Sequence, residues 1–286
     1  MYFTLLKIGG DMGSSYGWAL RGDNVPPWQT DRGFAMTGRV INCVAGAATA
    51  AIVFAILAIF VGGLGAGIGA FAMAIAPGHV VHSRFQTSDV FATFLIALSL
   101  YFMLRLVENP GTPKLRPMVL AAAAAGLAAG TKYLGAVLLV PLLLSLFLAR
   151  PFEGRPKVPI KPTLAVVGVF LAAFLLATPG IVFDNANFMM GVGYEFAHSA
   201  AGHGIVFQNT ANGFVYHLAN MIESFGGIPF IIGVSGITVA VIKRNNWAVI
   251  LAVFFVVYYI VIGRAEVKFL RYVLPLLPVL AVGVGW

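Results

Sequence analysis

Ionisable residues beside long apolar runs are the first candidates for chemistry in this sequence. Only 10% of the 286 residues are charged, whereas 60% are hydrophobic. A charge inside such a run is costly to desolvate, which makes it a functional candidate. Asp89 opens one apolar run and could present its carboxylate to a reaction centre. The alternative is that Ser88 or Asp89 only caps a helix N-terminus, where an acidic group suits the helix dipole.

The basic residues Arg264, Lys268 and Arg271 form a second group of candidates. If this stretch is helical, spacings of four and three residues place the three cations on one face, with Glu266 pointing elsewhere. Such a face could clamp a phosphate or pyrophosphate. The alternative is ordinary contact between a basic helix end and lipid headgroups.

Two isolated cations also lie beside apolar runs. Lys132 follows Gly130 and Thr131, and Arg39 precedes the first long run. Each of these side chains must reach either water, by snorkelling, or a bound anion. Both interpretations stay open for both residues.

The histidines and the cysteine do not indicate a metal centre. His198, His203 and His217 are separated by five and then fourteen residues, which matches no compact ligand motif. His79 and His82 are equally unspecific. Cys43 is the single cysteine and is expected to serve packing. We therefore expect no metal and no cofactor, with a divalent cation as the open alternative.

The elements that must position these residues are apolar runs of membrane-spanning length. A helix needs about 20 residues to cross a bilayer. The sequence predicts an all-α polytopic membrane protein of one domain over residues 1–286, with about eight or nine transmembrane helices. Gly130–Tyr133 is expected to divide the stretch 118–148 into two short helices. The expected spans are Val40–Phe60, Gly62–Gly78, Val90–Leu106, Met118–Gly130, Leu134–Leu148, Thr163–Phe183, Gly226–Ile242, Trp247–Gly263 and the run from Tyr272 onward.

The connections between these runs fall into two sets of different composition. One set has short basic loops in which Glu108 and Glu153 are the only acids, and the other holds all five histidines and the remaining acids. Short basic loops mark the cytoplasmic side of a membrane. We therefore place residues 1–39 on the outer side, together with a loop over 184–225 that forms a folded cap. Because the net charge of +8 is spread over such loops, nucleic acid is not an expected partner, whereas the lipid bilayer is.

Several short motifs occur in a recognisable order along the chain. They are Gly38–Arg39 before a helix, Ala76–Phe85 followed by Thr87–Asp89, Gly126–Tyr133, and Arg271–Pro278. In this order and spacing they resemble the lipid-carrier-dependent glycosyltransferases of the GT-C class. The similarity is to the protein O-mannosyltransferase-like branch, glycosyltransferase family 39 and its bacterial relatives.

The resemblance implies an inverting glycosyltransferase with a polyprenyl-phosphate-linked sugar as its donor. The acceptor would be a glycan, a lipid or a protein, and the active site would face the outside of a bacterial or archaeal plasma membrane. Asp89 would line the cavity as an acid. The implied donor- and phosphate-binding residues are Arg271, Lys268, Arg264, Lys132, Tyr133 and Tyr272, and the other cavity candidates are Arg39, His82 and Arg84.

The resemblance also implies a catalytic base in the first outer loop. Asp11, Asp23 and Asp31 do not lie in the corresponding motif, so we expect the base to lie upstream of this chain. The chain also ends within an apolar run that is shorter than the roughly 20 residues of a span. We therefore expect a piece that lacks the first helix and the C-terminal part.

Two other functions remain as alternatives, a transporter or flippase of lipid-linked sugars and an inactive membrane piece. Transporters usually have repeated halves and helices broken near the membrane midplane. The sequence has no evident repeated halves, and its polar residues gather at one boundary, which favours an enzyme. An inactive piece predicts that Asp89 does not converge with the basic residues.

Overall fold

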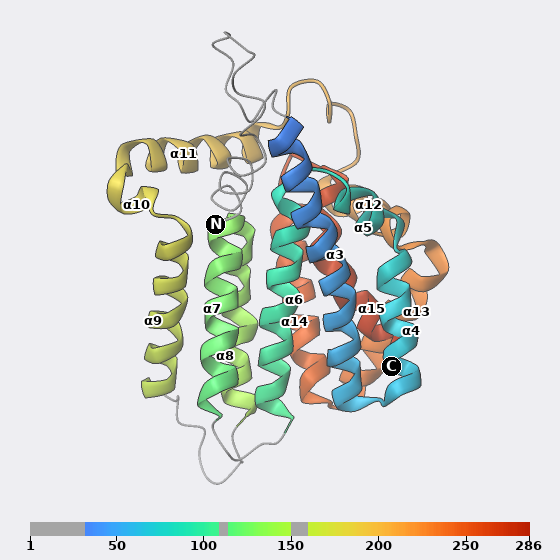
Figure 1. Ribbon diagram of the computed structural model, residues 1–286. Helices are drawn as coiled ribbons and strands as arrows, with labels where there is room; N and C mark the ends of the chain where they lie inside the picture. The colour runs from blue at the N-terminus through green and yellow to red at the C-terminus, as the bar shows by residue number, and fades with distance from the viewer. Residues whose placement is uncertain (1–31, 109–113, 150–159) are drawn as a thin grey trace.

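The computed structural model describes residues 32–108, 114–149 and 160–286, and within these ranges the chain is helical without strands (Figure 1). Four of the described helices contain a segment long and apolar enough to cross a membrane, and two bent pairs raise the number to as many as six. The four are α3 (Arg32–Phe60), α6 (Ser88–Val107), α9 (Ile160–Ala177) and α14 (Asn246–Gly263). The prediction of an all-α membrane fold is confirmed.

Each bent pair breaks at a residue that explains the bend. Helices α4 (Gly63–Ile75) and α5 (Pro77–Ser83) meet at 58°, because proline is well suited to open a helix but not to continue one. Helices α12 (Gly213–Phe225) and α13 (Gly227–Ile242) meet at 108°. Between them Gly226 has a φ of 91°, a conformation that favours glycine. Both α5 and α12 lie at the upper end of the bundle in Figure 1, which we call the polar end.

The remaining apolar elements are shorter. Helix α7 (Leu115–Thr131) stops before Lys132, and the chain continues as the 3₁₀ helix η2 (Tyr133–Leu138) and as α8 (Leu139–Leu148). This is the break that the sequence predicted at Gly130–Tyr133. The final unit is η3 (Leu270–Leu276) followed by α15 (Leu277–Gly285), and α15 is buried along most of its length.

Two expected outer segments differ from the structure. Helix α3 begins at Arg32, so only residues 1–31 of the expected segment 1–39 remain, and they lie outside the described residues. The expected loop over 184–225 is largely helical, because it contains α11 (Asn185–Ala201) and α12. A short helix, α10 (Gly180–Phe183), leads into α11, which lies across the polar end of the bundle (Figure 1).

Small residues bring several helices into close contact. A side chain at Gly126 on α7 would meet the backbone oxygen of Phe170 on α9. A side chain at Gly283 on α15 would likewise meet the backbone oxygen of Gly233 on α13. In a bilayer, where lipid tails are as apolar as leucine, such close backbone contact is a main source of helix association. The packing holds the helix ends in fixed positions at the polar end.

Candidate active site

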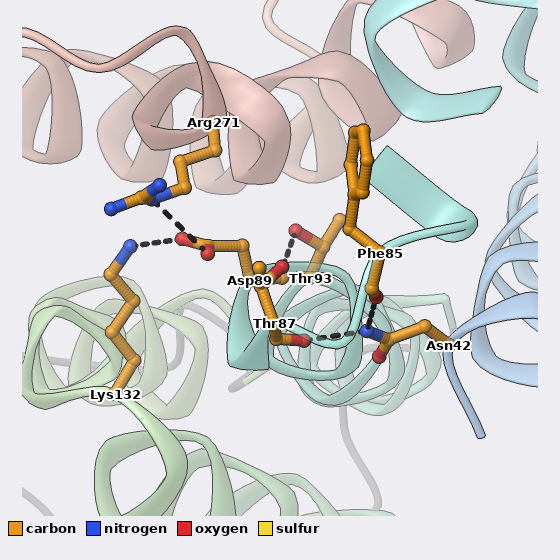
Figure 2. A network of polar contacts seen from close by, with 7 residues as sticks. All are labelled: Asn42, Phe85, Thr87, Asp89, Thr93, Lys132 and Arg271. Atoms are coloured by element: carbon orange, nitrogen blue, oxygen red, sulfur yellow. Dashed lines mark hydrogen bonds and ion pairs between the residues drawn. The ribbon is translucent and has the colours of Figure 1, made fainter. Parts of the chain in front are cut away.

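Asp89, Lys132 and Arg271 converge at the polar end from three separate parts of the chain (Figure 2). Asp89 lies in the first turn of α6 and is only 5% exposed. Its Oδ1 atom pairs with Nζ of Lys132, and its Oδ2 atom lies 3.5 Å from Nε of Arg271. One carboxylate between two cations leaves a net positive charge, so the cluster has the charge that an anionic ligand requires.

Aromatic rings lie against the two cations. Nζ of Lys132 is 4.2 Å from the centre of the Tyr272 ring. Cζ of Arg271 is 4.2 Å from the centre of the Phe269 ring and 6.0 Å from that of Tyr272. Cations on aromatic faces are stabilised electrostatically. The rings therefore hold Lys132 and Arg271 in place while leaving their N–H groups available to a ligand.

Asn42 fixes the turn that leads into Asp89. It is fully buried on α3, and its side-chain amide donates hydrogen bonds to the carbonyl oxygens of Phe85 at 2.5 Å and Thr87 at 2.6 Å. Thr87 is the N-cap residue of α6. One turn further on, the Thr93 hydroxyl donates to the Asp89 carbonyl oxygen at 2.8 Å. The two bonds from Asn42 tie the start of α6 to α3, whereas the Thr93 bond lies within α6 (Figure 2).

The structure brings Asp89 and Lys132 into one ion-paired cluster. No side chain caps the N-terminus of α6 by a hydrogen bond, and Asp89, which lies in its first turn, directs its carboxylate to two cations. Lys132 does not snorkel, because its ammonium group turns to Asp89 and Tyr272. It lies in the break between α7 and η2, where burial lowers its pKa and the Asp89 carboxylate opposes that shift.

The expected helical face of Arg264, Lys268 and Arg271 is wrong. The residues between α14 and η3 are not helical, so the spacing of four and three does not align the three cations. Glu266 does not point elsewhere either, since its Oε2 atom lies 3.3 Å from Nζ of Lys268. Charge spacing predicts a common face only where the backbone is helical.

Lys268 belongs to a second polar cluster beside the first. The residue is 3% exposed, and its Nζ atom donates to Oγ1 of Thr210 at 3.3 Å. The side-chain amide of Asn220 donates to the Lys268 carbonyl oxygen at 3.1 Å and lies 3.3 Å from Nδ1 of His217. The His217 and Tyr272 rings are 6.3 Å apart, so Tyr272 connects the two clusters.

The other predicted site residues have different surroundings. His82 interacts electrostatically with Asp89, Lys132 and Arg271 and therefore belongs near the cluster. Tyr133 is 42% exposed and contacts Phe188 of α11, with 6.4 Å between ring centres. The remaining three residues are exposed, and none of them forms an ion pair with Asp89 in the described part of the chain. They are Arg39, Arg84 and Arg264.

No group of three or more His, Cys, Asp or Glu side chains within residues 32–108, 114–149 and 160–286 is arranged to hold a metal ion. Two histidines nevertheless meet, since Nδ1 of His203 lies 3.2 Å from Nε2 of His198. The His203 ring also contacts the Phe269 ring at 5.2 Å. This pair therefore links α11 to the residues before Arg271.

Sequence reasoning missed two buried polar residues near the cluster. Asn42 is one, and Tyr258 on α14 is the other. Tyr258 is fully buried and interacts electrostatically with Asp89, and its hydroxyl has no hydrogen-bond partner among the described residues. Both are polar residues inside apolar runs, which is the signal that could have identified them.

The bundle is similar to solved glycosyltransferases of the GT-C class. ArnT from Cupriavidus metallidurans bound to undecaprenyl phosphate matches over 100% of this chain and 48% of its own, with 17% identity and a TM-score of 0.70. The same protein in the apo state matches with 18% identity and a TM-score of 0.61, over 99% of this chain and 54% of its own. The oligosaccharyltransferase of Archaeoglobus fulgidus in the apo form matches over 99% of this chain and 41% of its own, with 14% identity and a TM-score of 0.59.

The sequence gives the family. Residues 33–182 match the family described as dolichyl-phosphate-mannose-protein mannosyltransferase, and the chain belongs to it. A comparison with curated proteins gives no match. The chain spans about half the length of the solved structures it resembles. The GT-C class and the mannosyltransferase-like family expected from the sequence are thereby confirmed.

Proposed function

We propose that this chain forms the membrane core of a glycosyltransferase that transfers a sugar from a polyprenyl-phosphate-linked donor to an acceptor. The convergence of Lys132 and Arg271 on Asp89 carries this proposal. A sugar phosphodiester has one negative charge, which matches the net positive charge of the cluster. The membership in a mannosyltransferase family and the undecaprenyl phosphate bound by ArnT support the same donor class.

The chemistry follows from where charge develops. An acceptor hydroxyl oxygen attacks the anomeric carbon while its proton passes to a carboxylate base. The bond from that carbon to the phosphate oxygen breaks, and the phosphate leaves with the electron pair. Negative charge on the leaving phosphate then rises, and fixed cations stabilise that transition state. Lys132 and Arg271 would supply this stabilisation, whereas Asp89 would hold both cations in position. Attack opposite the leaving group inverts the anomeric centre.

The location of the cluster suits a donor with a lipid tail. Asp89, Lys132 and Arg271 lie at helix ends, where a phosphate can remain at the membrane boundary while its chain stays among lipids. We place this end outside a bacterial or archaeal plasma membrane, because the other end has the short basic loops. A glycan, a lipid or a protein would serve as acceptor. The buried charged residues Asp89 and Lys268 both lie at the polar end, which also favours an enzyme over a flippase, because a flippase needs polar groups near the midplane.

The proposal is tested by substituting Arg271 in the full-length protein and measuring transfer from a labelled polyprenyl-phosphate-linked mannose. Arg271→Ala is expected to reduce kcat by about 100-fold, the size of effect seen when one transition-state donor is removed. Arg105→Ala is the matched control, because Arg105 is an ion-paired arginine near the opposite end of α6, 3.2 Å from Glu108. This control is expected to keep full transfer.

The assay separates loss of function from loss of protein if membrane levels and unfolding temperatures of both variants are measured. Transfer at the wild-type rate by a well-folded Arg271→Ala variant contradicts the role of Arg271 in the reaction. Equal losses in both variants would show that arginine removal acts through stability rather than through the donor site.

A further inference from the structure

One face of α11 is directed toward the Asp89 cluster. Phe188 on this helix contacts Tyr133, the neighbour of Lys132. Eleven residues further along α11, the Ser199 carbonyl oxygen accepts a hydrogen bond from the backbone N–H of Glu266 at 2.9 Å. These two contacts join α11 to both segments that supply cations to the cluster. The face between Phe188 and Ser199 therefore lies over the region between Lys132 and Arg271.

Glu195 is the acidic residue on this face. It follows Phe188 by seven residues and precedes Ser199 by four, and both spacings return to the same side of an α-helix. The neighbouring His198 also turns to this side, since its ring contacts His203, which packs on Phe269. The helix register therefore places Glu195 on the same side of α11 as Phe188, which contacts Tyr133.

Electrostatic interactions agree with this placement. Glu195 interacts with Lys132, with Tyr133 and with Tyr272. Lys132 and Tyr272 belong to the cluster, and Tyr133 follows Lys132 as the first residue of η2. Glu195 is thus a second carboxylate near the cations, and it comes from an element that the sequence predicted only as part of a loop.

The two carboxylates differ in what they can bind. Both oxygens of Asp89 are engaged by cations. The Glu195 carboxylate is exposed and has no hydrogen bond or ion pair with any described residue, so its oxygens can accept hydrogen bonds from a ligand. The negative charge of Glu195 repels a phosphate, so an anionic ligand is disfavoured at this carboxylate. The exposed ring of Tyr133 lies on the same side, and an aromatic face beside a carboxylate suits a neutral ring with hydroxyl groups.

We propose that Glu195 and Tyr133 form a binding site for a sugar ring, in which the carboxylate accepts hydrogen bonds from sugar hydroxyls and the phenol ring packs against the apolar face of the sugar. This site rests on the proposed function. The sugar comes either from the lipid-linked donor or from a glycan acceptor, because both present the same hydroxyl groups.

The test is a binding measurement with the purified full-length protein. The probes are polyprenyl phosphate, polyprenyl-phosphate-linked mannose and octyl mannoside, each titrated onto the wild type, Glu195→Gln and Glu223→Gln. Glu223 is the matched control, because it is an exposed glutamate on α12 at the same end. We expect Glu195→Gln to weaken one mannose-bearing probe by about tenfold or more, the loss that accompanies a charged hydrogen bond, with polyprenyl phosphate unaffected.

The two sugar sources give different results. If only the affinity for polyprenyl-phosphate-linked mannose falls, the site binds the donor sugar. If only the affinity for octyl mannoside falls, the site binds an acceptor glycan. Wild-type affinity of Glu195→Gln for both mannose probes, or an equal loss in Glu223→Gln, overturns the sugar site while leaving the proposed function intact. If the wild-type protein binds neither polyprenyl phosphate nor polyprenyl-phosphate-linked mannose, the proposed function itself is contradicted.

Discussion

At the scale of single residues, the arrangement around Asp89 is costly to maintain. Removing charges from water costs several kcal/mol per ion, and a buried ion pair often adds little net stability. A chain that needed only a stable helix bundle could place apolar residues at positions 89 and 132. The retention of a carboxylate between two cations, each resting on an aromatic ring, is therefore better explained by binding than by stability.

Asn42 is expected to act on the reaction through position alone. Asn42→Leu removes the donor to the Phe85 and Thr87 carbonyl oxygens, which frees the turn before α6 and lets Asp89 shift. We expect sugar transfer to fall about tenfold or more through kcat, because small misplacements of a catalytic group are costly. The KM for the donor should change less. Steady-state kinetics of the full-length variant measures both quantities.

A second buried polar residue on the same helix gives the control. The Thr49 hydroxyl is fully buried and donates to the Ala45 carbonyl oxygen at 2.8 Å, within α3. Thr49→Val therefore removes a buried hydrogen bond without touching the turn before α6. Both variants should lose about 1 kcal/mol or more of stability, but only Asn42→Leu should lose transfer. Similar kinetics in the two variants would contradict a positioning role.

At the scale of elements, α7 and α9 are held together by small residues. Gly126→Leu on α7 would drive a side chain into the Phe170 oxygen and the Cβ atom of Ala173, so we expect a loss of about 1–3 kcal/mol or more. Gly168→Leu on α9 meets nothing within 4 Å and should be neutral. Unfolding temperatures in detergent compare the two, and an equal fall for both would contradict the close α7–α9 contact.

The sequence predicted most elements because apolar runs and breaking residues determine them directly. The break at Lys132 is an example, since a glycine and a charge interrupt one long run there. The helices α11 and α12 were not predicted, because their mixed aromatic and polar composition has no clear membrane-span signal. The prediction of a common helical face for Arg264, Lys268 and Arg271 was wrong for a related reason, because regular spacing does not make a segment helical.

At the scale of the whole molecule, the polar end gathers residues that are far apart in the chain. Charges beside apolar runs, together with motif order, pointed to Asp89, Lys132 and Arg271 as candidates. Their pairing, however, depends on how α6, η2 and η3 pack, which no local pattern determines. Asn42 could not be predicted for the same reason, because its partners are 43 and 45 residues away. The packing of the bundle thus brings residues from separate sequence motifs into one site.

The central claim is that Lys132 and Arg271, positioned by Asp89, bind the phosphate of a polyprenyl carrier. Its most direct test is the affinity of the purified protein for undecaprenyl phosphate, measured by native mass spectrometry for the wild type, Lys132→Met and Arg105→Ala. The account predicts a carrier complex in the wild type and in Arg105→Ala, and at least about tenfold weaker binding in Lys132→Met, as expected for a lost charged contact. Equal carrier affinity in all three proteins would contradict it.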